Sequence, residues 1–276
     1  ANMTVKAAGT IAIGKDAGAA LTTGGGNTII GFQAGDAITS TGGVTIMGYN
    51  AGTGINTVDA SGSTLIGYQA GQAITSGIGN TAVGYNALGA NTTGTENTAI
   101  GNRALEDNTI GTHNVSIGQG SLQSNTTGTY NVAVGYQAMN LNTTGVNNTA
   151  LGHLALQQNT IGTSNTAVGY ESLRQNTGIN NTSVGSGCLR NNTTGAYNVA
   201  VGMRALEANT LGALNTALGY KALNANTTGQ QSTAVGYEAL YANTIGNYNA
   251  ALGYGALKSN TTGAHNTGVS YNALQA

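Results

Sequence analysis

The chain has 276 residues, with 45 glycines, no proline, no tryptophan and only 8 basic and 9 acidic side chains. A net charge of -1 provides no field that attracts phosphate groups, so nucleic acid is not expected as a partner. No apolar run approaches the ~18 residues of a membrane helix, and disordered chains usually carry more charge and proline. The composition therefore predicts a repetitive, β-rich protein that does not insert into a membrane.

A unit of about 17 residues repeats through 80–276, and the segment NVAVGYQAMNLNTTG over 131–145 belongs to one copy. We call the glycine that follows Val, Ile or Leu the marker glycine and count positions from it, so that Gln137 is at +2 of Gly135. One interval is shorter by a single position, where Asn176-Thr177-Gly178 lacks one Thr. A period this short indicates one supersecondary unit stacked on itself.

Residues 1–79 also contain the marker glycine at regular intervals, at Gly14, Gly31, Gly48 and Gly67, but differ at other positions of the repeat. The Ala-Leu pair at +3 and +4 becomes Ala-Gly, as at Ala34-Gly35, and Leu or Ile replaces Asn at +7. Two extra residues lie between Gly48 and Gly67. We expect variant coils over 1–79, regular coils over 80–276, and one continuous solenoid of about 16 coils.

Within a coil, the alternation of larger and smaller residues before the marker predicts a short strand. Ala-Leu and then Asn-Thr-Thr-Gly follow, and these residues tolerate the backbone of tight turns. Two helices do not fit into a unit this short with an obligatory Gly. The fold class is therefore all-β, a β-solenoid or β-roll. We expect large aliphatics such as Val201 and Leu206 to fill a thin core, and the Ala/Gly strand face to receive a neighbouring chain.

Residues in the same phase stack above one another in such a fold, so sequence columns become ladders. The +7 column predicts a structural amide ladder, as in cross-β stacks. The +1 column is aromatic in most coils and predicts cross-coil packing or an interchain seam, with a sugar-stacking stripe as the alternative. The ladder residues are Asn91, Asn108, Asn125 and Asn142 at +7, and Tyr85, Tyr136, Tyr170 and Tyr220 at +1.

The +12 column is the most varied in the repeat, and a binding face is expected there first. The alternative is an unselected solvent edge. The charged side chains fall at few positions, mainly +2 and +5, which we expect to face water. The residues proposed for the +12 binding column are His113, Tyr130, Tyr197, Tyr248 and His265.

No catalytic, cofactor or metal site is expected. The acids are predicted to be isolated on exposed turns, the three His lack an acidic partner at a useful spacing, and a thin solenoid should have no pocket. Cys188 occupies a +3 position that other coils fill with Ala, which indicates a small packed side chain. One cysteine allows neither a disulfide nor a zinc framework.

The unit Asn-Thr-Ala-Val-Gly-Tyr-x-Ala-Leu-x-x-Asn-Thr-Thr-Gly, as over 80–94 and 215–229, resembles repeats of phage tail-fibre proteins. It is also similar to the left-handed β-roll heads of YadA-like trimeric autotransporter adhesins. The likeness covers nearly the whole chain, but the period is longer than in the adhesin heads. It implies a left-handed, homotrimeric rod at a cell, virion or extracellular surface that binds host surface or matrix.

We expect a non-enzymatic fibre subunit that self-associates laterally, as a trimer, and end to end through open coil edges. The alternative is a tail-fibre shaft or adhesin head that binds host glycan or matrix. A minor alternative is ice binding through a threonine column at +8, formed by Thr92, Thr109, Thr126 and Thr143.

Overall fold

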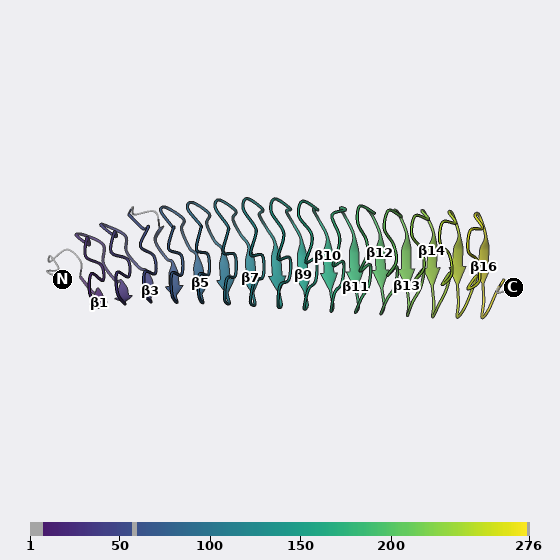
Figure 1. Ribbon diagram of the computed structural model, residues 1–276, viewed down its shortest axis with the longest axis horizontal. Coiled ribbons are helices and arrows are strands. Elements are labelled where there is room, and N and C mark those ends of the chain that lie inside the picture. Colours follow the sequence, from purple (N-terminus) through teal and green to yellow (C-terminus); the bar gives the residue numbers. More distant parts are fainter. Residues whose placement is uncertain (1–7, 57–59, 275–276) are drawn as a thin grey trace. The chain divides into compact units, whose positions relative to one another are not determined.

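The computed structural model describes residues 8–56 and 60–274, and its strands are all short. These residues form two compact units, the first ending at Thr144 and the second beginning at Gly145. Figure 1 shows the strands of each unit in chain order. The change from variant to regular coils, expected at residue 80, falls inside the first unit. Both kinds of coil can therefore be compared within one body.

Each coil contributes one strand of three residues, placed directly before the marker. The first unit contains β1 (Ile11–Ile13), β2 (Thr28–Ile30), β3 (Thr45–Met47), β4 (Thr64–Ile66), β5 (Thr81–Val83), β6 (Thr98–Ile100), β7 (Val115–Ile117) and β8 (Val132–Val134). The second unit contains β9 (Thr149–Leu151), β10 (Thr166–Val168), β11 (Thr182–Val184), β12 (Val199–Val201), β13 (Thr216–Leu218), β14 (Thr233–Val235), β15 (Ala250–Leu252) and β16 (Thr267–Val269).

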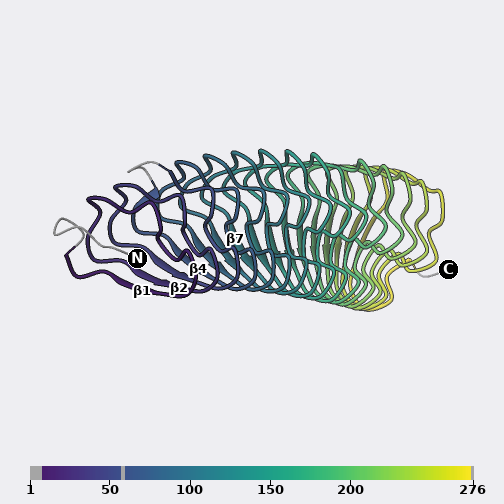
Figure 2. The same cartoon turned by 60° about the vertical axis from the view of Figure 1, so that its left-hand side comes forward.

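Within each unit, every strand pairs in parallel with the strands of the preceding and following coils, and the register follows the sequence period. Thr81 pairs with Thr98, one full period later. The strands also stay in register across the shortened interval, because Thr166 pairs with Thr182. Thr45 pairs with Thr64, so the two extra residues leave the sheet register intact. The predicted β-solenoid is confirmed, and Figure 2 shows the coils of each unit as successive loops.

The corners of the coil require left-handed backbone at three positions, +2, +4 and +12. In the coil of Gly101 these are Arg103, Leu105 and His113, with φ of 55°, 51° and 58°. This conformation costs a residue with a Cβ about 1 to 2 kcal/mol. The variant coils have Gly at +4 and +12, for example Gly35 and Gly43.

The marker glycine is required by the coil that follows it. Gly101 has φ 138°, and a Cβ built there would lie 2.6 Å from the carbonyl oxygen of Gly118, the next marker. The same approach recurs along the chain, and a Cβ at Gly253 would meet the carbonyl oxygen of Ser270. Ser270 itself has φ 138° and carries the side chain that the other markers lack.

The core lies behind the middle residue of each strand, at -2, and this corrects the predicted strand faces. Ala200 and Leu206 are fully buried, but Val201 is 38% exposed. Because the coil is narrow, only a small residue fits inward at -2 when Leu fills +4, so the larger residues at -3 and -1 point outward. The Ala side that we expected to receive a neighbouring chain is the interior of the coil.

Two columns of asparagine amides run through the regular core. At +7, Asn108 Nδ2 donates to Asn91 Oδ1 over 2.7 Å and to the carbonyl oxygen of Gly111 over 3.0 Å. Asn125 and Asn142 continue the column at 2.8 Å. At -4, Asn80 Oδ1 accepts the backbone N–H of Asn97 at 3.0 Å. The side chains of these residues are fully buried, and their hydrogen bonds compensate for lost hydration.

The variant coils fill the same interior with aliphatic side chains. Ile29, Ile38 and Ile46 are fully buried, with Ile38 at the +7 position of the amide column. A Cβ at Gly35 would lie 2.7 Å from Ile38 Cδ1 and 3.1 Å from Ile46 Cδ1. The isoleucine methyl groups thus occupy the space that Leu at +4 takes in a regular coil.

Candidate functional site

The outward face of the strands, formed by positions -3 and -1, carries Val, Ile, Leu or Met at -1 in each described strand and mostly Thr at -3. We call it the strand face. None of the sixteen strands in the described residues contains a charged side chain. Val184, Val201 and Leu218 are 37%, 38% and 38% exposed, so three successive coils present aliphatic groups to solvent. Exposed apolar columns of this kind mark interaction surfaces.

The +1 column lies beside the strand face and contains runs of stacked rings. In the first unit, Tyr68 and Tyr85 have ring centroids 5.2 Å apart and planes 6° apart. In the second unit, Tyr220 stacks on Tyr237 at 5.0 Å, and Tyr170 stacks on His153 at 5.4 Å. Tyr136 occupies the same position and is 43% exposed. Within a run each ring covers its neighbour's face, which leaves only the ring edges for a ligand.

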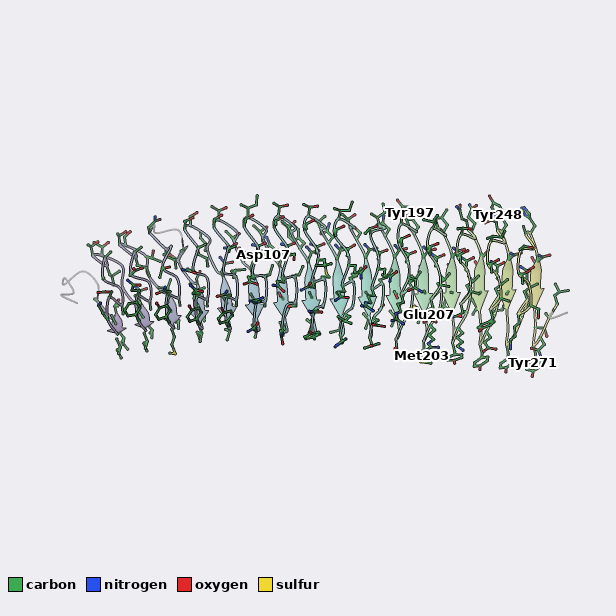
Figure 3. All side chains as sticks on the ribbon, viewed as in Figure 1. Asp107, Tyr197, Met203, Glu207, Tyr248 and Tyr271 are labelled. Atoms are coloured by element: carbon green, nitrogen blue, oxygen red, sulfur yellow. The ribbon has the colours of Figure 1, made fainter. Side chains whose placement is uncertain are left out.

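The +12 column lies on an exposed corner with left-handed backbone. Tyr130, Tyr197 and Tyr248 are 57%, 54% and 51% exposed. His113 stacks on Tyr130 at 4.9 Å, and Tyr248 stacks on His265 at 4.8 Å. Within the second unit, Figure 3 shows Tyr197 and Tyr248 at one edge of the coils, and Met203 and Tyr271 at the opposite edge.

Two predictions about charged groups are wrong. His113 does have an acidic partner, because its Nε2 lies 2.9 Å from Glu96 Oε2 in the preceding coil. Glu171 is neither isolated nor exposed. Its carboxylate is buried and pairs with Arg174 Nη1 and with Arg190 Nε, each at 2.9 Å. Arg174 belongs to the same coil as Glu171, whereas Arg190 and the Glu96 partner of His113 come from adjacent coils, which spacing within one coil does not reveal.

The +8 threonines use their hydroxyl groups inside the stack. Thr92 Oγ1 donates to the carbonyl oxygen of Thr109 at 3.0 Å, and Thr109 Oγ1 donates to that of Thr126 at 3.0 Å. Thr126 bonds in the same way to Thr143 at 3.1 Å. These hydroxyls point along the stack, so the column presents few donors to ordered water outside.

A cavity of about 360 Å³ opens beside the +1 and +2 columns of the first unit, contrary to the expectation of no pocket. Its lining includes Tyr85, Asn102, Arg103, Gln119 and Gly120. The cavity forms where the repeat departs from its usual residues. Asn and Gln replace Tyr at +1 in two successive coils, and Gly120 lacks the long side chain found at +2 in the coils on either side.

A second cavity, of about 240 Å³, lies around Gly89 and is lined by Asn86, Glu106 and Asp107 among others. Glu106 is held by Asn86 Nδ2 at 3.2 Å and by Gln123 Nε2 at 2.8 Å. Desolvation, followed by the charge of Glu106, raises the pKa of Asp107. This cavity is therefore acidic, whereas the larger one is lined by amides.

Cys188 is fully buried, and burial raises the pKa of its thiol to about 11. Its Sγ lies 3.2 Å from the carbonyl oxygen of Ala200. The thiol is thus a packing group rather than an accessible nucleophile. Among the described residues, no group of three or more His, Cys, Asp or Glu is arranged to hold a metal ion.

Comparison with known proteins gives no family for the chain. No protein-family model matches it, and a search of curated proteins found no significant similarity. In the part of the chain that the structure describes, no helix is long and apolar enough to cross a membrane. Inferences about function therefore depend on the surfaces themselves.

Proposed function

We propose that the chain is a non-enzymatic structural subunit of a fibre at an extracellular, cell or virion surface, built by lateral association of its copies. The observation that carries this proposal is the uncharged, half-exposed strand face, which repeats once per coil. Three copies and a left-handed coil are the arrangement that the resemblance to trimeric adhesin heads and tail fibres favours.

The period of the strand face favours a second copy of the chain as its occupant. Its apolar groups recur at the coil spacing, about 4.8 Å for paired strands. A partner must share this spacing to contact every coil, and a second copy does. The absence of charge from the described strands removes the desolvation penalty that a buried ionic group would add. Covering aliphatic columns of this kind stabilises the complex by about 25 cal/mol for each Å² of apolar surface removed from water.

Sedimentation analysis of three proteins tests the proposal. The wild type should sediment as a trimer, and the double variant Val201→Lys/Leu218→Lys should sediment as a monomer with an unchanged far-UV circular dichroism spectrum. Leu214→Lys is the matched control, because Leu214 is 52% exposed but lies in the +12 column. A wild type that stays monomeric at high concentration would contradict the proposal.

A tail-fibre shaft or adhesin head that binds glycan remains the second candidate function. The observation that favours it is the cavity beside Tyr85 rather than the +12 column, because that cavity combines an aromatic wall with several amides. Binding at the +12 column stays a prediction. It is tested by replacing Tyr130, Tyr197 and Tyr248 with Ser together and screening a glycan array, where an unchanged binding pattern would remove that column from consideration.

A further inference from the structure

We propose that the cavity around Gly120 binds one neutral pyranose ring of a saccharide. This inference specifies the site and ligand class of the second candidate function and is independent of lateral association. It rests on three features of one place: an aromatic ring at the end of a stacked run, a set of amide groups, and a hollow of the right size.

The aromatic wall is the last ring of a stacked run. Tyr85 covers one face of its ring with Tyr68, at 5.2 Å between centroids. The next residue in the +1 column is Asn102, so no ring of that column stacks on the other face, and Tyr85 borders the cavity. Tyr85 is 43% exposed, about as much as Tyr68 inside the run, and its exposed apolar ring surface can pack against the C–H groups of a sugar ring.

The amides provide both donors and acceptors in one small volume. The side chains of Asn102 and Gln119 are exposed, and neither makes a hydrogen bond to another side chain or carbonyl among the described residues. Each carboxamide offers an N–H donor and a carbonyl acceptor, which matches the alternating needs of neighbouring sugar hydroxyls. Gln123 is already engaged, since Asn140 Nδ2 donates to it at 3.2 Å. It shapes the floor rather than serving the ligand.

The hollow exists because Gly120 has no side chain. A Cβ there would lie 3.3 Å from Asn140 Nδ2 and 3.5 Å from Gln137 Cγ, between the +2 side chains of the adjoining coils. The resulting volume of about 360 Å³ falls at the lower end of the range of small-molecule sites. It suits one sugar ring, and not a larger apolar ligand.

The charge of the cavity favours a neutral sugar. Among the described residues that line it, Arg103 alone is charged, and its Nε lies 3.7 Å from Glu106 Oε2, which partly offsets the guanidinium charge. Acidic sugars would gain from Arg103 but would also be repelled by the carboxylate of Glu106 beside it. A neutral ring bound through hydroxyl groups avoids this conflict.

Saturation-transfer NMR with the methyl glycosides of glucose, galactose, mannose and N-acetylglucosamine tests the proposal. At least one should bind, with a Kd of about 1 to 10 mM, the affinity expected of a single exposed ring. Gly120→Gln restores the side chain that Gln137 supplies in the next coil, with the same left-handed backbone, and should weaken binding at least about 10-fold. Asn102→Tyr should do the same, because its ring would stack on Tyr85 and occupy the space beside it.

Gly187→Gln is the matched control, because Gly187 also occupies +2, has φ 64° and lies outside the cavity. It should bind the sugar as the wild type does. Binding of none of the four glycosides, or equal binding by wild type and both filled variants, would overturn the proposal. Binding of methyl glucuronide alone would overturn its neutral-ligand part. The sedimentation result is read separately, so failure of lateral association would not be mistaken for failure of this site.

Discussion

The variant and regular coils build the same cross-section from opposite chemistry. In the coil of Gly31, the interior is closed by Gly35, Ile38 and the Ile46 of the next strand, all apolar. In the coil of Gly202, the equivalent positions are Leu206, Asn209 and Ala217, and the asparagine continues a column of amides. The volume is nearly conserved while its distribution changes. The +4 and +7 positions therefore change together, whereas the residue of the next strand does not always follow, because the coil of Gly67 combines Gly71 and Ile74 with Ala82.

The aliphatic interior of the variant coils and the amide columns of the regular coils stabilise the stack in two different ways. Buried aliphatic groups stabilise a variant coil by removing apolar surface from water, without fixing the neighbour's register. The amide columns bond each regular coil directionally to the next, at a net value of about 1 kcal/mol per hydrogen bond. A regular coil thus depends on identical neighbours, whereas a variant coil depends on neighbours of suitable size.

The largest effect is expected where both kinds of coil obey the same rule, at the marker. Gly31→Ala and Gly101→Ala should each destabilise the protein by at least about 4 kcal/mol, because the new Cβ meets the backbone of the next coil. Chemical denaturation followed by circular dichroism measures this. Ser270→Ala is the control and should change stability by less than about 0.5 kcal/mol. A tolerated alanine at Gly101 would refute the marker rule.

Asn209→Ile should destabilise a regular coil by about 3 to 4 kcal/mol. It removes the bonds from Asn209 Nδ2 to Asn192 Oδ1 and to the Gly212 carbonyl oxygen, and leaves the amide of Asn226 with one of its two acceptors, the Gly229 carbonyl oxygen. The triple variant Leu206→Gly/Asn209→Ile/Ala217→Ile recreates the variant interior and should recover about half of the loss measured by denaturation. If the triple variant is no more stable than the single one, the two interiors are not interchangeable.

Gly35→Leu is the reverse experiment in a variant coil, with an expected cost of about 1 to 3 kcal/mol from overpacking. Its side chain would collide with Ile38 and Ile46, while the left-handed backbone is one that Leu105 also adopts. Adding Ile46→Ala should restore part of the lost stability in thermal denaturation. If Gly35→Leu leaves the stability unchanged, the interior of the variant coil has enough free space for the larger side chain.

The smallest effect concerns the thiol of Cys188 at high pH. Because burial raises its pKa from 9.0 to about 11, the folded state holds this proton more tightly than the unfolded chain. The stabilisation that the protonated thiol gives to the folded state is therefore fully present below pH 9, and it is lost progressively as the pH rises from 9 through 11. At pH 10 the loss is about 1.4 kcal/mol, measured as the difference between wild type and Cys188→Ala. Moving the thiol to Ala34, fully buried at +3 of a variant coil, should reproduce this pH dependence if both interiors are equally closed.

The sequence period predicted the fold class and even the register shifts, because a stack of parallel strands converts each interval directly into pairing. It did not predict which strand face is buried. Alternation in Val199-Ala200-Val201 is symmetric, and the choice depends on the width left once Leu206 is inside. The ion pair of His113 with Glu96 and the cavity at Gly120 arise between coils. Reading the columns of +2, +5 and +12 across successive coils, rather than along one coil, would have found both.

A coil can be stacked closely on another only if the marker residue of the lower coil has no Cβ, as in glycine. Ser270 carries a Cβ where every other marker has none, so a coil placed on β16 in the same register would bring its carbonyl oxygen against that carbon. Stacking of any further coil on β16 in this register, from this chain or from another copy, therefore meets one methylene group that the other markers do not carry. End-to-end association stays a prediction, and Ser270→Gly would remove this obstacle to it, visible in electron micrographs as longer filaments.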